Sequence, residues 1–226
     1  MKPNDSQQLL HPGPAGTLAH AAADLRRRLC ADGAADGEDD FSGPEQQWAA
    51  LIEWAGAAGK ILPLDFPPPD REGGREHDVT LDDASGRWIK YTKPSSSGYT
   101  VSWNEAGEPY MHNATPLEYL QRLLWQNEVL GDDIQLIGLW QQQPHQWRIV
   151  TSQPGLQGSR ATLDDLSAAF VSTGFTLLRW RGIGYQGSLS FHIEGFDIWD
   201  VHPANVLLSP EGIPLPIDVI ITRTPP

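Results

Sequence analysis

The spacing of apolar residues predicts two helices near the start of the chain. Within residues 18–29, leucine and alanine recur every three or four positions, and the last turn carries three arginines, which suit the negative end of a helix dipole. Residues 44–59 repeat this spacing from Trp48 to Ala55, and Gly59 ends the pattern. The first helix could dock on the body of the protein, on a partner or on nothing, and the pattern leaves all three open.

Alternation of apolar and polar residues predicts strands through the rest of the chain. Residues 77–81 and 87–91 alternate on either side of the turn Asp82–Gly86, which predicts a β-hairpin. Further strands are expected at 99–103, 109–111, 134–140, 147–151, 175–180, 189–193, 206–208 and 215–221.

Two later helices begin with capping signals. Thr115 and Glu118 have the spacing of a capping box, so a helix is expected from there to about Gly131. Thr162 is expected to cap a second helix over residues 161–173.

The order of these elements favours an α+β fold, in which an antiparallel sheet with one packed helix precedes a smaller second lobe. Four segments follow: a flexible or helical arm with an acidic linker at 1–44, a helical lead-in at 45–72, the sheet-and-helix lobe at 73–151 and the smaller lobe at 152–226. Within the arm, residues 1–16 are expected to be mobile and residues 31–44 to form the acidic linker.

The composition narrows the class of protein. A chain of 226 residues with 39% hydrophobic residues can bury one sizeable core or form two small lobes. Its net charge of −13 disfavours nonspecific binding to nucleic acid or anionic membranes. The single cysteine, Cys30, excludes an intrachain disulfide, and no apolar run approaches a membrane span or a signal-peptide core. We therefore expect a cytoplasmic protein that binds neither nucleic acid nor membrane.

Candidate chemistry is concentrated near the end of the chain. Asp200, Asn205 and Asp218 are separated by five and thirteen residues, and short apolar runs adjoin the last two. Asp and Asn individually favour turns, but an acid inside the apolar run Ile217–Ile221 needs a partner or a metal ion. Two acids and an amide fixed on adjacent strand edges can position a hydroxyl group and bind Mg²⁺ on a phosphate chain.

Together with upstream positions, these residues resemble a protein-kinase-like fold. The resemblance rests on Lys90 in the returning strand of the hairpin, a helix carrying Glu118, a strand ending in Ser152–Pro154, and the series from Asp200 to Asp218. It covers roughly residues 73–221, about two thirds of the chain. More narrowly, the chain is similar to the small kinase-like modules found in polyvalent proteins of phages and conjugative plasmids.

The resemblance implies a truncated kinase-like fold that uses Mg²⁺ and ATP. Asp200 would orient the accepting hydroxyl group and take its proton, and His202 would stand beside the transferred phosphate in place of the usual lysine. Asn205 would bind a Mg²⁺ ion, and Asp218 would bridge Mg²⁺ to the phosphates. The acceptor, a protein or a small molecule, stays open.

The same resemblance implies nucleotide contacts earlier in the chain. Lys90 would contact the α- and β-phosphates, and a helix carboxylate, either Glu118 or Glu128, would hold it. Glu118 could instead serve only the capping box. Gln153 would lie in the hinge beside the adenine.

The chain departs from the family pattern in several places. Ile198–Trp199 stands where kinases carry His-Arg, and Val219 follows Asp218 where kinases carry Phe. The phosphate-cradling loop is reduced to Gly73–Gly74. The sequence ends eight residues after Asp218, so an activation loop and a large helical lobe are not expected. A minimal kinase or a degenerate one is the expectation.

Two other classes of protein stay open. His192, Glu194, Asp197, Asp200 and His202 fall within eleven residues, and such ligands could bind Zn²⁺ or Mn²⁺ in a metal-dependent hydrolase, although no His-Glu-x-x-His signature accompanies them. The other class is a catalytically silent kinase-like module that binds a nucleotide or a protein.

Overall fold

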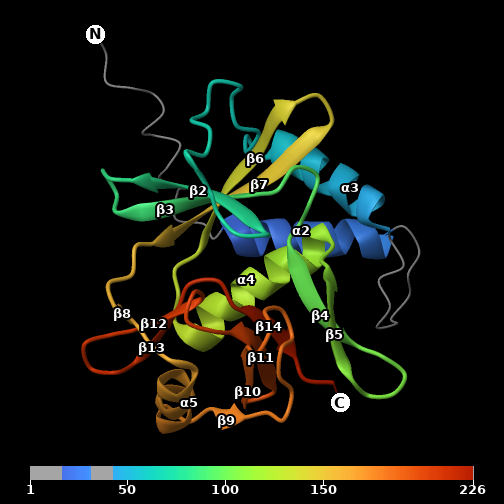
Figure 1. The fold of residues 1–226 in the computed structure, drawn as a ribbon. Helices are drawn as coiled ribbons and strands as arrows, with labels where there is room; N and C mark the ends of the chain where they lie inside the picture. The colour runs from blue at the N-terminus through green and yellow to red at the C-terminus, as the bar shows by residue number, and fades with distance from the viewer. Residues whose placement is uncertain (1–16, 32–42, 226) are drawn as a thin grey trace. The chain divides into compact units, whose positions relative to one another are not determined.

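The chain folds into two compact units in the computed structural model, which describes residues 17–31 and 43–225 (Figure 1). Unit 1 takes the described residues up to Gly98 together with 113–154, and unit 2 takes 99–112 and the residues from Gly155 onwards. The predicted arm at 1–16 and nearly all of the predicted linker at 31–44 lie outside the described residues. Both units combine helix with antiparallel sheet, so the predicted α+β class is confirmed.

Unit 1 is built on a five-stranded antiparallel sheet in the order β1-β2-β3-β7-β6. The strands are β1 (Arg71–Glu72), β2 (His77–Asp82), β3 (Arg87–Thr92), β6 (Gln135–Gln143) and β7 (Gln146–Pro154). The predicted β2–β3 hairpin is confirmed, because His77 pairs with Thr92 and Asp82 pairs with Arg87. Gly86 closes its turn with a left-handed φ of 67°, which glycine adopts without steric cost.

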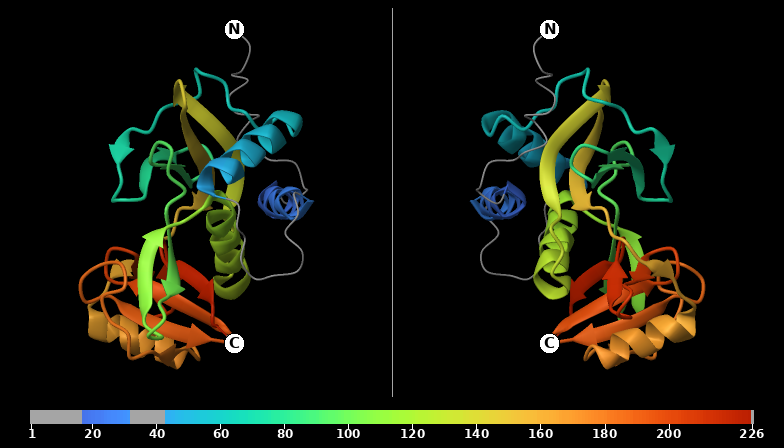
Figure 2. Two further views of the ribbon diagram at one scale, coloured as in Figure 1. Left: turned by 90° about the vertical axis from the view of Figure 1, so that its right-hand side faces the viewer. Right: turned by 90° about the vertical axis from the view of Figure 1, so that its left-hand side faces the viewer.

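The described helices of unit 1 are α2 (Thr17–Ala31), α3 (Pro44–Ala57) and α4 (Pro116–Leu130), of which α2 and α3 contact β6 and both contact α4. The β6–β7 pair lies between α2 and α3 on one side and β2 and β3 on the other (Figure 2). A single apolar cluster joins α2, α3 and α4 to β6 and β7. The first predicted helix, α2, therefore docks on the body of the protein, because its Ala21 and Leu25 are fully buried in this cluster.

The ends of α4 follow their sequence signals. The N–H of Glu118 donates to Thr115 Oγ1, and the N–H of Thr115 donates to Glu118 Oε2 at 2.7 Å, so the predicted capping box is confirmed. Gly131 ends the helix in the left-handed conformation with φ of 65°. In unit 2, α5 (Leu163–Ser172) starts in the same way, with the predicted cap Thr162 and Asp165 as its reciprocal partner.

Unit 2 contains three small sheets and the helix α5. The four-stranded sheet has the order β14 (Ile220–Arg223), β11 (Phe196–Val201), β10 (Leu189–Ile193) and β9 (Thr176–Leu177). The three-stranded sheet has the order β13 (Pro214–Pro216), β12 (Val206–Leu208) and β8 (Ser159–Arg160), and β4 (Tyr99–Trp103) pairs with β5 (Pro109–Asn113). The helix α5 contacts β9, β10, β12 and β13.

The division into units differs from the predicted lobes at the β4–β5 hairpin. The sequence places these strands in the lobe at 73–151, whereas residues 99–112 belong to unit 2. The reason is apolar packing: Val101 and Trp103 lie in one cluster with the fully buried Trp199 of β11. The rings of Trp103 and Trp199 meet edge to face at 5.9 Å.

Two strand predictions require correction. The strand β11 is not among those expected from the sequence pattern, although it is an interior strand of its sheet. The expected strand at 215–221 is interrupted, because β13 ends at Pro216 and β14 begins at Ile220. Pro216 pairs with Val206 in one sheet and Ile220 pairs with Trp199 in another, so the chain changes sheets at residues 217–219. Asp218 therefore lies in a bend and not inside a strand.

A buried ion pair joins three strands of unit 1. Arg148 of β7 lies with its Nη1 2.6 Å from Asp78 Oδ2 of β2, and the same Nη1 donates to the carbonyl oxygen of Thr92 at the end of β3. Lys93 also pairs with the Asp78 carboxylate. Burial pushes the pKa of Asp78 upwards, but the hydrogen bonds from Lys93 and Arg148 outweigh it and leave the pKa below the ordinary value.

We expect Arg148→Met to destabilise unit 1 by about 3 kcal/mol at pH 7, because it leaves a buried carboxylate with only one cationic partner. Since the folded-state pKa of Asp78 is lowered, the stabilisation from this pair is present above the unfolded-state pKa and is lost as the pH falls through the folded-state pKa. Urea unfolding at a series of pH values checks both points. The exposed Arg27, replaced by Met, should change the unfolding free energy far less.

Candidate functional site

In unit 2, Asp200 is the penultimate residue of β11, and Asn205 immediately precedes β12. The Asn205 Nδ2 donates to the carbonyl oxygen of Asp200 at 3.1 Å and to its Oδ2 at 3.0 Å. Both contacts of this side-chain atom are with oxygen acceptors, so the atom is the amide nitrogen. The Asn205 Oδ1 takes no part in these two contacts. The structure thus brings together the first two residues of the predicted series.

The backbone of Asp200 adopts the left-handed conformation, with φ of 61°. This conformation is uncommon for residues other than glycine, and Asp tolerates it better than most. The turn that holds it is closed by Asn205 and Val206, whose N–H groups both donate to the carbonyl oxygen of His202. Strain of this kind persists where surrounding contacts determine the geometry, which is common at functional sites.

A glycine-containing loop covers the other side of the Asp200 carboxylate. The N–H of Tyr185 donates to Asp200 Oδ1 at 2.7 Å. Gly184 has φ of 99°, and a Cβ atom at this position would lie 2.4 Å from the Asp200 carboxylate. Both carboxylate oxygens therefore accept one hydrogen bond, and no side chain larger than hydrogen fits at Gly184 without displacing the acid.

The environment of Asp200 disfavours its charged form. Burial raises its pKa above the ordinary value, and the neighbouring Asp218 raises it further. The hydrogen bonds from the N–H of Tyr185 and from the Asn205 amide act in the opposite direction without cancelling the increase. A carboxylate with a raised pKa is a stronger base than an ordinary aspartate.

Asp218 joins this group through the backbone. The N–H of Ile217 donates to the carbonyl oxygen of Asn205 at 2.7 Å, and the N–H of Asp218 donates to the same oxygen at 3.4 Å. Asp218 is next to Val219, which is fully buried and anchors the bend where the chain changes sheets. The bend thus fixes the second acid beside Asn205, although not in the strand that the sequence predicts.

His202 also lies beside Asp200. Its Nε2 is 3.6 Å from Asp200 Oδ1, which is too long for a hydrogen bond. The N–H of Ala204 donates to His202 Nδ1 at 3.3 Å. The Tyr185 ring stacks on the imidazole with 4.8 Å between ring centroids. Of the candidate residues in unit 2, Asp200, His202, Asn205 and Asp218 therefore form one cluster.

Unit 1 places Lys90 on β3, between Val79 of β2 and Thr151 of β7. Its side chain is largely buried, which differs from a solvated edge lysine. The helix carboxylates expected to hold it are used otherwise or are exposed: Glu118 closes the capping box of α4, and Glu128 is exposed. The structure thus favours the capping role for Glu118.

The inward charge of α4 comes from a residue that the sequence analysis missed. Arg122, one turn after Glu118, is 1% exposed, and its Nη1 lies 2.8 Å from Glu76 Oε1. The sequence did contain a signal for a buried arginine: Arg122 lies among leucines on the apolar face of the predicted amphipathic helix.

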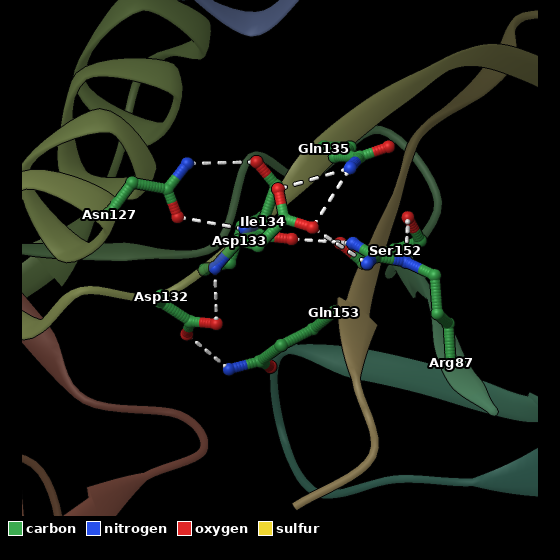
Figure 3. A network of polar contacts seen from close by, with 8 residues as sticks. All are labelled: Arg87, Asn127, Asp132, Asp133, Ile134, Gln135, Ser152 and Gln153. Atoms are coloured by element: carbon green, nitrogen blue, oxygen red, sulfur yellow. Dashed lines mark hydrogen bonds and ion pairs between the residues drawn. The ribbon is translucent and has the colours of Figure 1, made fainter. Parts of the chain in front are cut away.

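Gln153 is held by a polar network that ties the end of β7 to the turn between α4 and β6 (Figure 3). Its Nε2 donates to Asp132 Oδ2 at 2.5 Å. On the neighbouring residues, the Arg87 guanidinium donates to Asp133 Oδ2 at 2.8 Å and to Ser152 Oγ at 3.1 Å. The predicted hinge segment is therefore anchored to α4 through a rigid turn.

Gln153 also extends past the edge of the sheet. The last pair between β6 and β7 joins Gln135 to Ser152, so the backbone of Gln153 and Pro154 is paired with β3 only. In the part of the chain that the structure describes, the Gln153 Oε1 is buried without a hydrogen bond. A buried oxygen without a donor carries a desolvation cost that a donor group would relieve.

The residues of the hydrolase alternative do not gather into a metal site. Asp197 is buried and pairs with His192, whose Nδ1 is 2.8 Å from its Oδ1, while Glu194 is exposed in the β10–β11 turn. Among the described residues, no three of the five predicted ligands bring their ligand atoms within metal-binding reach of one another. This arrangement counts against the metal-dependent hydrolase.

Comparisons of the chain with protein-family models, with curated proteins and with solved structures gave no match. In the two described stretches, 17–31 and 43–225, no helix combines the length and apolar character needed to cross a membrane.

We expect Asp200→Asn to remove the part of the pH dependence of stability that comes from the Asp200 charge, because the amide stays neutral. It also loses one of the two hydrogen bonds that the carboxylate accepts, because an amide nitrogen cannot accept, and this loss does not change with pH. The folded-state pKa is raised above the unfolded value of about 3.8, so the charge destabilises the folded state increasingly as the pH rises through the interval between the two values. The stability of the variant relative to the wild type should therefore be lowest below this interval and highest above it. Thermal unfolding at a series of pH values checks this, with the exposed Glu194→Gln as control. A difference in stability between variant and wild type that stays constant across this interval would contradict the raised pKa.

Proposed function

We propose that this protein is a Mg²⁺-ATP-dependent phosphotransferase related to protein kinases. The single observation that carries the proposal is the cluster in unit 2, in which Asn205 holds the Asp200 carboxylate through its side chain and the Asp218 segment through its backbone. The order of the three residues along the chain matches the order that the kinase resemblance implies.

Asp200 is suited to accept a proton from a hydroxyl group. Each of its oxygens accepts one hydrogen bond from the protein and keeps a second lone pair. Its raised pKa brings it closer to the range of an efficient general base. In the proposed reaction, the hydroxyl oxygen forms a bond to the γ-phosphorus as the bond to ADP breaks, and Asp200 takes the hydroxyl proton.

Asn205 and Asp218 supply the kind of oxygen ligands that Mg²⁺ prefers. The orientation of the Asn205 amide commits its nitrogen to Asp200 and leaves its Oδ1 for a cation. Mg²⁺ commonly uses only one or two protein ligands, together with water and phosphate oxygens, so a small set of this kind is sufficient. When bound, Mg²⁺ would neutralise charge on the phosphates.

In unit 1, Lys90 and Gln153 keep the roles that the resemblance implies. Lys90 is a largely buried lysine in the middle of the sheet, as a residue that contacts α- and β-phosphates would be. Gln153 lies where β7 runs past the end of β6 and offers a carbonyl oxygen that lacks a hydrogen bond in the described chain, which suits the amino group of an adenine. Gly73 and Gly74 connect β1 to β2, the position of a phosphate-cradling turn.

The proposal separates binding from transfer. Asp218→Asn should weaken Mg²⁺-dependent ATP binding at least about tenfold, because it removes a charged metal ligand, whereas Asp200→Ala should leave binding nearly unchanged. Asp200→Ala should lower the rate of phosphoryl transfer about a hundredfold or more, because it removes the general base. Titration calorimetry with Mg²⁺ and ATP measures binding, and ADP release with water or protein as acceptor measures transfer.

Asp164→Asn is the matched control, since Asp164 is an exposed acid of the same unit. Wild-type binding by Asp218→Asn would remove this residue from the metal site. Mg²⁺-dependent ATP binding by the wild-type protein without any transfer would instead identify a silent nucleotide-binding module. Full transfer activity in both Asp200→Ala and Asp218→Asn would contradict the roles assigned to these two acids.

A further inference from the structure

A loop that the sequence analysis did not single out has a fixed shape in unit 2. It runs from Gly182 to Ser188, and three of its glycines have left-handed φ values. The N–H of Gly182 donates to the carbonyl oxygen of Ser188 at 2.9 Å, and the N–H of Ser188 donates back to the carbonyl oxygen of Tyr185 at 3.0 Å. Ser188 is fully buried, and Ile183 packs on the apolar cluster around Trp199. The base of the loop is thus anchored in unit 2, and its tip is exposed.

Tyr185, at the tip, makes two different contacts with the candidate site. Its N–H donates to Asp200 Oδ1, and its ring stacks on the His202 imidazole with an interplanar angle of 29°. Tyr185 is nevertheless 62% exposed, so burial of its ring in a core does not explain its position. A surface tyrosine without a role would not be expected to contact both a strained acid and the histidine two residues after it.

The contacts of His202 determine where its proton lies. Its Nδ1 accepts the N–H of Ala204, so Nδ1 is unprotonated and the ring is neutral with its proton on Nε2. The Tyr185 ring restrains rotation of this imidazole from one face. With the ring held in this way, the Nε2–H is directed to the region of the Asp200 carboxylate, 3.6 Å away.

We propose that Tyr185 is a positioning residue that holds His202 as a neutral Nε2–H donor beside Asp200. The catalytic consequence rests on the proposed phosphotransferase function, in which the His202 N–H would donate to an oxygen of the transferring phosphoryl group. The orientation of His202 itself does not depend on that function. Tyr185 contributes through its ring to His202 and through its backbone to Asp200, so side-chain substitution removes only the first contribution.

The experiment combines a spectroscopic and a kinetic readout on the full chain. Long-range ¹H–¹⁵N spectra of the histidine rings, without nucleotide, report the tautomer of His202. Release of phosphate from Mg²⁺-ATP, with water as acceptor, reports kcat and KM. Tyr185→Ala is compared with Tyr185→Phe, which keeps the ring, and with Tyr110→Ala, which removes an exposed tyrosine beside His112 in the same unit.

In Tyr185→Ala, we expect the His202 signals to change from the Nε2–H tautomer to a mixture, and kcat to fall on the order of tenfold with KM for ATP within about twofold of the wild-type value. Tyr185→Phe should retain the wild-type tautomer and kcat, and Tyr110→Ala should change neither. If Tyr185→Ala does not fold, Tyr185→Leu replaces it, because leucine keeps an apolar side chain without a ring.

Unchanged His202 signals in the ringless variants would overturn the positioning role, as would a Tyr185→Phe variant that behaves like Tyr185→Ala. Failure of the proposed function gives a different result. The wild-type protein would then show no Mg²⁺-dependent ATP binding or phosphate release, while the tautomer comparison would still decide the role of Tyr185.

Discussion

Asn205 is the residue on which the geometry of unit 2 depends. Its side-chain nitrogen holds the end of β11 at Asp200, and its carbonyl oxygen accepts the N–H groups of Ile217 and Asp218, where the chain passes from one sheet to the next. Its own N–H closes the turn onto His202. A single residue thus determines the separation of two acids that would otherwise repel each other. An aspartate at this position could accept hydrogen bonds but could not donate to Asp200, so the amide is a chemical requirement.

The same geometry explains why this site departs from the kinase pattern in its neighbours. Ile198 and Trp199, where the kinase resemblance implies His-Arg, are both fully buried because β11 is an interior strand of its sheet. The Trp199 indole donates to Thr222 Oγ1 of β14 at 2.8 Å and packs on Val101. These residues hold the strand in register up to Asp200, where the backbone turns left-handed. Packing in the core of unit 2 therefore offsets the free-energy cost of the strained backbone and the buried charge at Asp200.

Local signals in the sequence predicted local structure well. The β2–β3 hairpin, the caps at Thr115 and Thr162 and the helix end at Gly131 depend on contacts within a few residues, and all are confirmed. The break at residues 217–219 could not be read in this way, because it depends on pairing with β12 and β11, which lie in different sheets. The grouping of Asp200, His202 and Asn205 followed from their closeness in the chain. The position of Tyr185 beside Asp200 could not be predicted in this way, because only the folded loop brings its N–H to the Asp200 carboxylate.

The charges of residues 182–222 affect how much of the phosphate charge the protein and the metal ion would each neutralise in the proposed reaction. No lysine or arginine occurs between Gly182 and Thr222, although this stretch contains both Asp200 and Asp218. A kinase-like lysine beside the transferred phosphate would supply a positive charge, whereas His202, held as a neutral imidazole, supplies only a hydrogen bond. The carboxylates of Asp200 and Asp218 repel a phosphate chain. In the proposed function, the divalent ion therefore carries a larger share of charge neutralisation than in a kinase that has the lysine, and nucleotide affinity depends correspondingly more on Mg²⁺.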